Sequence, residues 1–173
     1  MTGVTTDERS EPAITAAERP MLEGWLDYHR DTLALKCVGL SDAQLREASV
    51  PPSQLSLLGL IRHMAEVERQ WFRNVMAGED AKSLYCTDED EDGDFHPTEA
   101  DSWEKAGATW RAEVDAAREI AAKHGLDDLS VGRSRKGEQF NLRWIYTHMI
   151  EEYARHNGHA DLVRERIDGT TGD

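Results

Sequence analysis

Residues 141–167, NLRWIYTHMIEEYARHNGHADLVRERI, combine a helical pattern with an unusual concentration of histidine. The chain holds seven histidines, and three of them fall within residues 148–159. Asn141 is a suitable N-cap, and the helix that it begins should reach Ile167. An α-helix advances about 100° per residue, which places four polar side chains within an arc of about 80°. They are His148, Glu152, His156 and His159.

This polar face lies among apolar residues of the same predicted helix. Those residues are Trp144, Ile145, Leu162 and Val163. The solvated face of an amphipathic helix normally lies opposite its apolar face, so the pattern predicts that imidazoles and a carboxylate reach into or near the core. A buried carboxylate is costly without a positive partner, so Glu152 needs either Arg155 or a divalent metal ion beside it.

Three further segments have the apolar spacing of long helices. We expect them at residues 18–37, at 56–78 and from near 96 to 125, where Gly78 and Gly125 provide stop signals. Ser41 and Gln44 form a capping box for a short accessory helix. The sequence therefore predicts an all-α four-helix bundle with a long acidic loop before the third long helix. Residues 1–14 lack periodicity and are expected to be disordered, which leaves residues 15–173 as one domain.

Composition excludes several classes of function. The net charge of −14 argues against nucleic-acid binding, because such modules present a basic patch. No segment approaches the roughly 18 apolar residues that span a bilayer, so no membrane insertion is expected. Cys37 and Cys86 are too few for a disulfide framework. The N-terminus has no apolar signal core, and the expected location is the cytoplasm.

His63 extends the polar face of the last helix into a candidate metal site. It lies on the apolar face of the second long helix, among Leu60, Val67 and Trp71. It should therefore point inward, toward Glu152 and His156. Two imidazoles and a carboxylate are donors that Zn²⁺, Ni²⁺ or Fe²⁺ accept, and three protein ligands leave positions open for water or substrate.

A single inward histidine is more often a hydrogen-bonded core residue than a metal ligand. The metal hypothesis therefore depends on His63, Glu152 and His156 together. His148 and His159 lie one turn to either side, and we expect them to orient the ligands or to transfer protons. The tryptophans are expected to belong to the core.

Residues 88–99, DEDEDGDFHPTE, have the spacing of a calcium-binding loop. The ligand positions would be Asp88, Asp90, Asp92 and Glu99. Pro97 interrupts this match, and the sequence shows neither a convincing preceding helix nor a second calcium loop. We favour a solvated acidic loop that covers one end of the bundle, and calcium binding between Asp88 and Glu99 is the alternative.

Two blocks carry a resemblance to a known family: LLGLIRHMAEVERQWF at 57–72 and LRWIYTHMIEEYARHNGHADLVRERIDG at 142–169. From about residue 18 to 169 the chain resembles the DinB-like superfamily of DinB/YfiT-like metalloenzymes, most closely its actinobacterial mini-circle-protein branch. The resemblance implies a four-helix bundle, often a homodimer, whose divalent metal is held by His63, Glu152 and His156. Many members have histidine at the position of Glu152, and the glutamate is similar to that of mycothiol-dependent maleylpyruvate isomerases.

The resemblance also implies an activity. Characterised relatives are transferases or isomerases that use mycothiol, bacillithiol or glutathione. We expect a divalent-metal-dependent transferase that uses a low-molecular-weight thiol, here mycothiol, as nucleophile toward an electrophilic small molecule. Neither Cys37 nor Cys86 lies in a motif beside the triad, so neither is expected to be the nucleophile. The alternatives are a metal-dependent hydrolase and a non-catalytic, stress-related metal-binding bundle.

Overall fold

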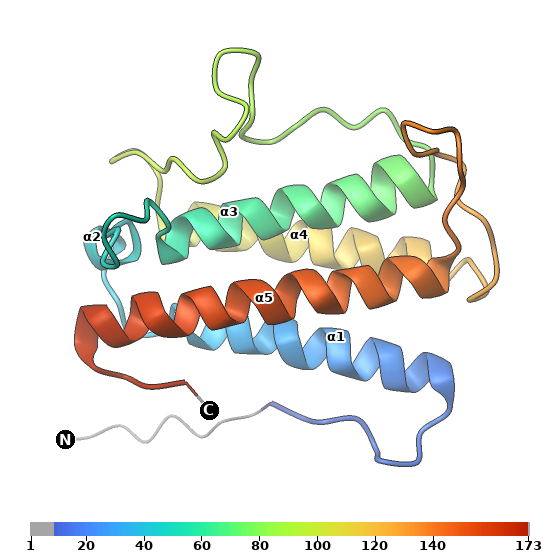
Figure 1. The fold of residues 1–173 in the computed structure, drawn as a ribbon, viewed down its shortest axis with the longest axis horizontal. Coiled ribbons are helices and arrows are strands. Elements are labelled where there is room, and N and C mark those ends of the chain that lie inside the picture. Colours follow the sequence, from blue (N-terminus) through green and yellow to red (C-terminus); the bar gives the residue numbers. More distant parts are fainter. Residues whose placement is uncertain (1–8, 173) are drawn as a thin grey trace.

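The computed structural model describes residues 9–172, which form helices and loops. Within this range there is no strand, only an isolated bridge between Leu129 and Asn141. The prediction of an all-α protein is confirmed (Figure 1). None of the helices in the described part of the chain is long and apolar enough to cross a membrane. The elements are α1 (Glu18–Leu35), α2 (Asp42–Leu45), α3 (Leu57–Glu68), η1 (Arg69–Met76), α4 (Trp103–Ala121) and α5 (Leu142–Asp168).

The predicted capping residues begin their helices as expected. Ser41 Oγ accepts a hydrogen bond from the Gln44 amide, and the Gln44 side chain accepts one from the Ser41 amide, which completes the capping box of α2. Asn141 Oδ1 accepts a hydrogen bond from the Trp144 amide at 2.8 Å and begins α5. α5 ends at Gly169, whose φ of 80° suits glycine.

The third long helix begins later than predicted, at Trp103 rather than near residue 96. The Asp101 side chain accepts hydrogen bonds from the Thr98 amide and hydroxyl, at 2.8 and 3.0 Å, which holds the preceding residues in a turn. Ser102 then caps the helix through the amide of Lys105. The turn uses backbone groups that a helix would otherwise need, so α4 starts after it.

The second long helix changes geometry along its length. α3 is a regular α-helix, and η1 continues it as a π-helix that ends before Gly78, where φ is 70°. The predicted extent of residues 56–78 is thus close to the observed one, but its second part does not follow the spacing of 3.6 residues per turn.

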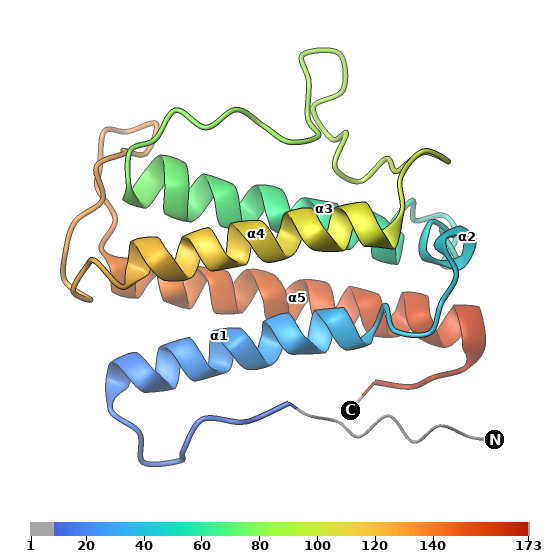
Figure 2. The same ribbon diagram turned by 180° about the vertical axis from the view of Figure 1, so that it is seen from behind.

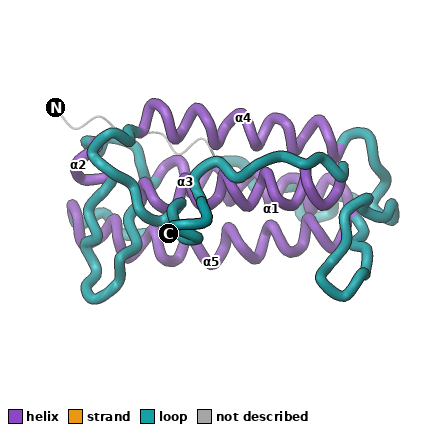
Figure 3. Tube along the Cα trace, turned by 90° about the horizontal axis from the view of Figure 1, so that it is seen from above, coloured by secondary structure: helices purple, strands orange, loops and turns teal. Residues whose placement is uncertain are grey.

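The long helices lie side by side. In Figure 1, α3 and α5 lie at the front and run in opposite directions, and Figure 2 shows α1 and α4 on the other side. α1 packs along α5, and α3 packs along α4. The segment between η1 and α4, residues 77–102, passes over the outer side of α3 (Figures 1 and 3). This packing places the predicted polar face of α5 against α3.

The prediction of disorder for residues 1–14 falls partly on residues 1–8, which lie outside the described residues. The remaining part of this segment lies near α1. Arg9 donates a hydrogen bond to the Thr32 hydroxyl at 3.1 Å, and its guanidinium lies 5.1 Å from the centre of the Tyr28 ring. These contacts attach residue 9 to α1.

A buried polar network crosses the otherwise apolar core. Arg30 of α1 donates two hydrogen bonds, both 2.8 Å, to the carboxylate of Glu68 at the end of α3. Tyr153 of α5 donates to the same carboxylate at 2.8 Å, and its hydroxyl accepts from Trp110 Nε1 of α4 at 2.8 Å. Glu68 is fully buried, so this network joins all four long helices through satisfied hydrogen bonds.

Candidate metal centre

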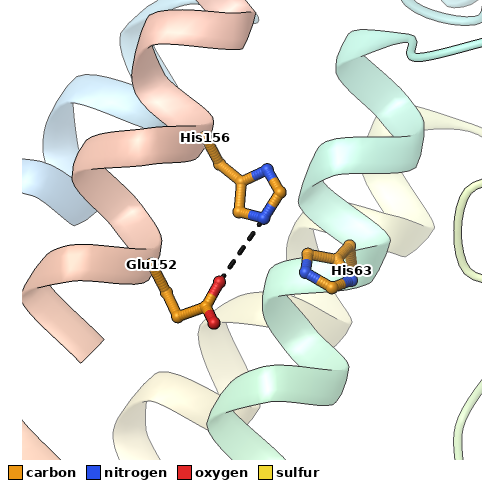
Figure 4. A group of neighbouring side chains, drawn as sticks. All are labelled: His63, Glu152 and His156. Carbon is orange, nitrogen blue, oxygen red and sulfur yellow. Dashed lines mark ion pairs between the residues drawn. The ribbon is translucent and has the colours of Figure 1, made fainter. Parts of the chain in front are cut away.

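The packing of α3 against α5 brings His63, Glu152 and His156 together (Figure 4). One potential ligand atom from each residue lies within 4.8 Å of the other two. His156 Nε2 is 3.5 Å from Glu152 Oε2, and the two imidazole rings have centres 4.6 Å apart. His156 is buried, whereas His63 and Glu152 are partly exposed. The site therefore has one side in the core and one side open.

Asp94 holds His63 in position from the outer side. Its Oδ2 lies 2.8 Å from His63 Nδ1, and the Phe95 ring stacks on the His63 imidazole with centres 4.3 Å apart. Burial raises the pKa of Asp94, but the hydrogen bond and charge of His63 lower it more, so the net shift is downward. An ionised carboxylate on Nδ1 favours the tautomer in which Nε2 is free to bind a metal.

His159 occupies the corresponding position beside His156. The Nδ1 atoms of the two rings lie 3.3 Å apart, so one of them can donate a hydrogen bond to the other. Burial, followed by the charges of His63 and His159, lowers the pKa of His156 to about 4. His156 is therefore neutral at pH 7, the state in which imidazole binds metal.

His148 lies on the far side of Glu152 from His156. Its Nε2 is 3.4 Å from Glu152 Oε1, and its Nδ1 is 3.6 Å from Glu151. Among residues 9–172, His148, Glu151 and Glu152 form the only other group whose three potential ligand atoms lie within 4.8 Å. Glu152 thus belongs to both groups, and His148 is the histidine next to the open side of the site.

The donor set fits a divalent ion. Arg155, one of the two partners considered for Glu152, instead pairs with the exposed Glu151 at 2.6 Å. Within the described residues no arginine or lysine pairs with Glu152, whose oxygens lie 3.4 Å from His148 and 3.5 Å from His156. A partly buried carboxylate that pairs with neither arginine nor lysine lacks a compensating charge, and a cation bound by His63, Glu152 and His156 would supply it.

The acidic loop contributes to this site in a way that its sequence does not indicate. Instead of being wholly solvated, residues 77–102 turn Asp94 and Phe95 inward against His63. The four carboxylates of the calcium motif form no metal-binding group of three within the described residues. Asp90 instead lies 2.8 Å from Nδ1 of the exposed His96. Asp94 is one acid among many in this segment, and only its burial distinguishes it.

Of the four apolar residues beside the polar face, two are not buried. Ile145 and Val163 lie in the core, but Trp144 and Leu162 are 45% and 57% exposed. The expectation that every tryptophan belongs to the core is wrong for Trp144.

A comparison with family models gives a match over residues 21–169, to the model described as Mycothiol-S-transferase. The match includes α3, η1, α4 and α5, and so every residue of the candidate metal centre. No curated protein matches the chain.

Proposed function

Because the chain belongs to the mycothiol S-transferase family, within the DinB-like superfamily, we propose that it is a divalent-metal-dependent transferase. It would join mycothiol, a low-molecular-weight thiol, to an electrophilic small molecule. The observation that carries this proposal is the convergence of His63, Glu152 and His156 at a partly open site inside the matched region. The proposal includes the superfamily's four-helix bundle as a single domain over residues 15–173, a homodimer and a cytoplasmic location.

His63, Glu152 and His156 would hold the ion, and Zn²⁺, Ni²⁺ and Fe²⁺ all accept this donor set. When bound, such an ion supplies Lewis acidity that lowers the pKa of a thiol placed beside it. Asp94 and His159 fix the orientations of the two imidazoles through their Nδ1 atoms.

His148 is the residue suited to move a proton. Its imidazole is partly exposed and lies between Glu152 and Glu151 at the open side of the site. It can accept the proton that the thiol releases, while the sulfur forms a bond to the electrophilic carbon and the leaving group departs with its electron pair. His159 lies against His156 and there serves the orientation of that ligand.

The protein's own cysteines are poorly suited to act as the nucleophile. Burial raises the pKa of Cys37 to about 12, so its thiol stays protonated at neutral pH. Burial also raises the pKa of Cys86. Its hydrogen bonds to Asp94 and Ser83 lower that pKa by a smaller amount, so the net shift is upward. This favours an external thiol.

Metal analysis of three variants tests the site. We expect His63→Ala and His156→Ala to lose stoichiometric metal while keeping their helical circular dichroism. His124→Ala, which changes a histidine outside the site, should keep its stoichiometric metal. Undiminished metal in both site variants would end the metal-centre hypothesis.

Incubation of the metal-loaded protein with mycothiol and a bimane electrophile tests the reaction. The S-conjugate should form faster than with the metal-free protein, and mass spectrometry should find no label on Cys37. A conjugate yield equal to the metal-free control would exclude the transferase. Hydrolysis of an ester substrate by the same sample would favour a hydrolase, and a site closed by His148 as fourth ligand would favour a non-catalytic metal-binding protein.

A further inference from the structure

Three aromatic rings gather beside the metal centre, where η1 meets the start of α5. We call Trp71, Phe140 and Trp144 the aromatic platform. Trp71 lies 5.1 Å from both Phe140 and Trp144, and Phe140 lies 4.6 Å from Trp144, measured between ring centres. Trp71 and Phe140 are partly buried against the core, so they support the exposed ring of Trp144 from below.

The exposure of Trp144 is not explained by packing alone. A tryptophan that is 45% exposed contributes little to the core, yet two other aromatic rings hold this one in a defined orientation. Rigid, partly exposed aromatic rings beside a polar site are typical of ligand-binding surfaces. Leu162 on the same helix is more exposed, at 57%, but it is not part of this ring cluster.

His148 joins the platform to the metal centre. Its ring stacks on Trp144, with centres 5.0 Å apart and an angle of 22°, and it meets Trp71 edge-on at 4.6 Å. The same imidazole lies 3.4 Å from Glu152. A ligand that reaches the metal centre from this end of α5 must therefore pass over the platform.

We propose that the aromatic platform binds the sugar part of mycothiol and so selects this thiol over smaller ones. The inference rests on the proposed function. Mycothiol is an N-acetylcysteine joined through an amide to a glucosaminyl-inositol. The C–H faces of such rings pack on aromatic faces, and Trp144 offers an accessible one. Glu151 and Arg155, exposed on the next turns of α5, can hydrogen-bond to the hydroxyl groups.

The distance from the sulfur of mycothiol to its two rings matches the distance along α5 from Glu152 to Trp144. Five bonds separate the sulfur from the glucosamine ring and three more reach the inositol, so the two rings lie roughly 6 to 13 Å from the sulfur. Trp144 precedes Glu152 by eight residues, which is roughly 12 Å along the helix. With the sulfur at the metal centre, the rings therefore extend over the platform, whereas N-acetylcysteine alone ends before it.

Calorimetric titration of the zinc-loaded protein with mycothiol and with N-acetylcysteine tests this inference. The ratio of the two affinities should favour mycothiol in the wild type and fall about tenfold in Trp144→Ala. Trp144→Phe, which keeps a ring, should retain most of the preference. Leu162→Ala removes an exposed apolar side chain from the same helix and should leave the ratio unchanged. Zinc content, measured on each sample, should be equal throughout.

An unchanged ratio in Trp144→Ala would overturn the inference, as would a wild type that binds both thiols equally or binds neither. An unchanged ratio together with a changed sedimentation coefficient would assign Trp144 to a contact between two copies of the chain. Because titration measures binding and does not depend on turnover, a failure of the platform proposal can be distinguished from a failure of the transferase proposal. A wild type that prefers mycothiol but forms no bimane conjugate would refute the transferase and leave the platform supported.

Discussion

Both imidazoles of the candidate metal centre have their second nitrogen engaged by another side chain. Asp94 engages Nδ1 of His63, and His159 engages Nδ1 of His156. This leaves Nε2 as the nitrogen available to an ion on each ring. Because a ligand that is already oriented loses less freedom on binding, these two contacts should raise metal affinity without adding a ligand.

Substitution of Asp94 tests this argument. Asp94→Asn removes the charge that favours the correct His63 tautomer, and we expect metal affinity to fall about 10- to 100-fold. A competition assay with a chromophoric chelator measures the change. Asp92→Asn alters an exposed acid two residues away and is the matched control. Equal affinities for the two variants would show that Asp94 does not support the site.

The low pKa of His156 predicts a pH dependence for the metal-free protein. The value of about 4 lies below the ordinary value of 6.5, so the unfolded chain binds more protons between these pH values. The free energy of unfolding should therefore fall as the pH drops from 6.5 to 4, by up to about 3 kcal/mol. Urea unfolding at several pH values should show a clearly smaller loss for His156→Gln, and an identical loss would contradict the assignment.

At the scale of elements, the antiparallel packing of α3 and η1 against α5 determines which residues meet. His63 of α3 lies opposite Glu152 and His156, and eight residues further along, Trp71 of η1 lies beside His148. The candidate metal centre and the aromatic platform therefore lie one after the other along the contact of α3 and η1 with α5. The π-helical geometry of η1 begins between His63 and Trp71, at Arg69.

The buried pair between α1 and α3 predicts a large effect on stability. Arg30→Met leaves the carboxylate of Glu68 buried without its positive partner, and we expect unfolding to become easier by about 3–5 kcal/mol. Urea denaturation followed by circular dichroism measures this. Arg118→Met removes an exposed partner of Asp27 and should cost less than about 1 kcal/mol. Similar losses in both variants would contradict the importance of burial.

At the scale of the whole molecule, a metal ion would join α3 to α5 across residues that are far apart in the chain. Anything that binds only the folded state stabilises it, so zinc at 100 times its dissociation constant should add about 2.7 kcal/mol to the free energy of unfolding. Denaturant melts at graded zinc concentrations measure this gain, and His63→Ala should show none. A gain of equal size in His63→Ala would place the zinc elsewhere.

Much of the architecture follows from local signals. Helical spacing, the caps at Ser41 and Asn141 and the stop near Gly78 predict the long elements to within a few residues, except for the start of α4. The three candidate ligands are also identifiable, because Glu152 and His156 lie four residues apart on a face that apolar residues surround. A periodic pattern reports which side of a helix is buried, whatever it packs against.

The amino-acid sequence by itself therefore determined the helices and the inward direction of His63, Glu152 and His156. Only the tertiary structure decided which side chains support them. Asp94 comes from a loop with many acids, and the exposure of Trp144 depends on which edge of α5 its neighbours leave uncovered. The physical reason is that spacing along a helix reflects local geometry, whereas the path of a loop and the covering of an edge depend on contacts between residues far apart in the chain.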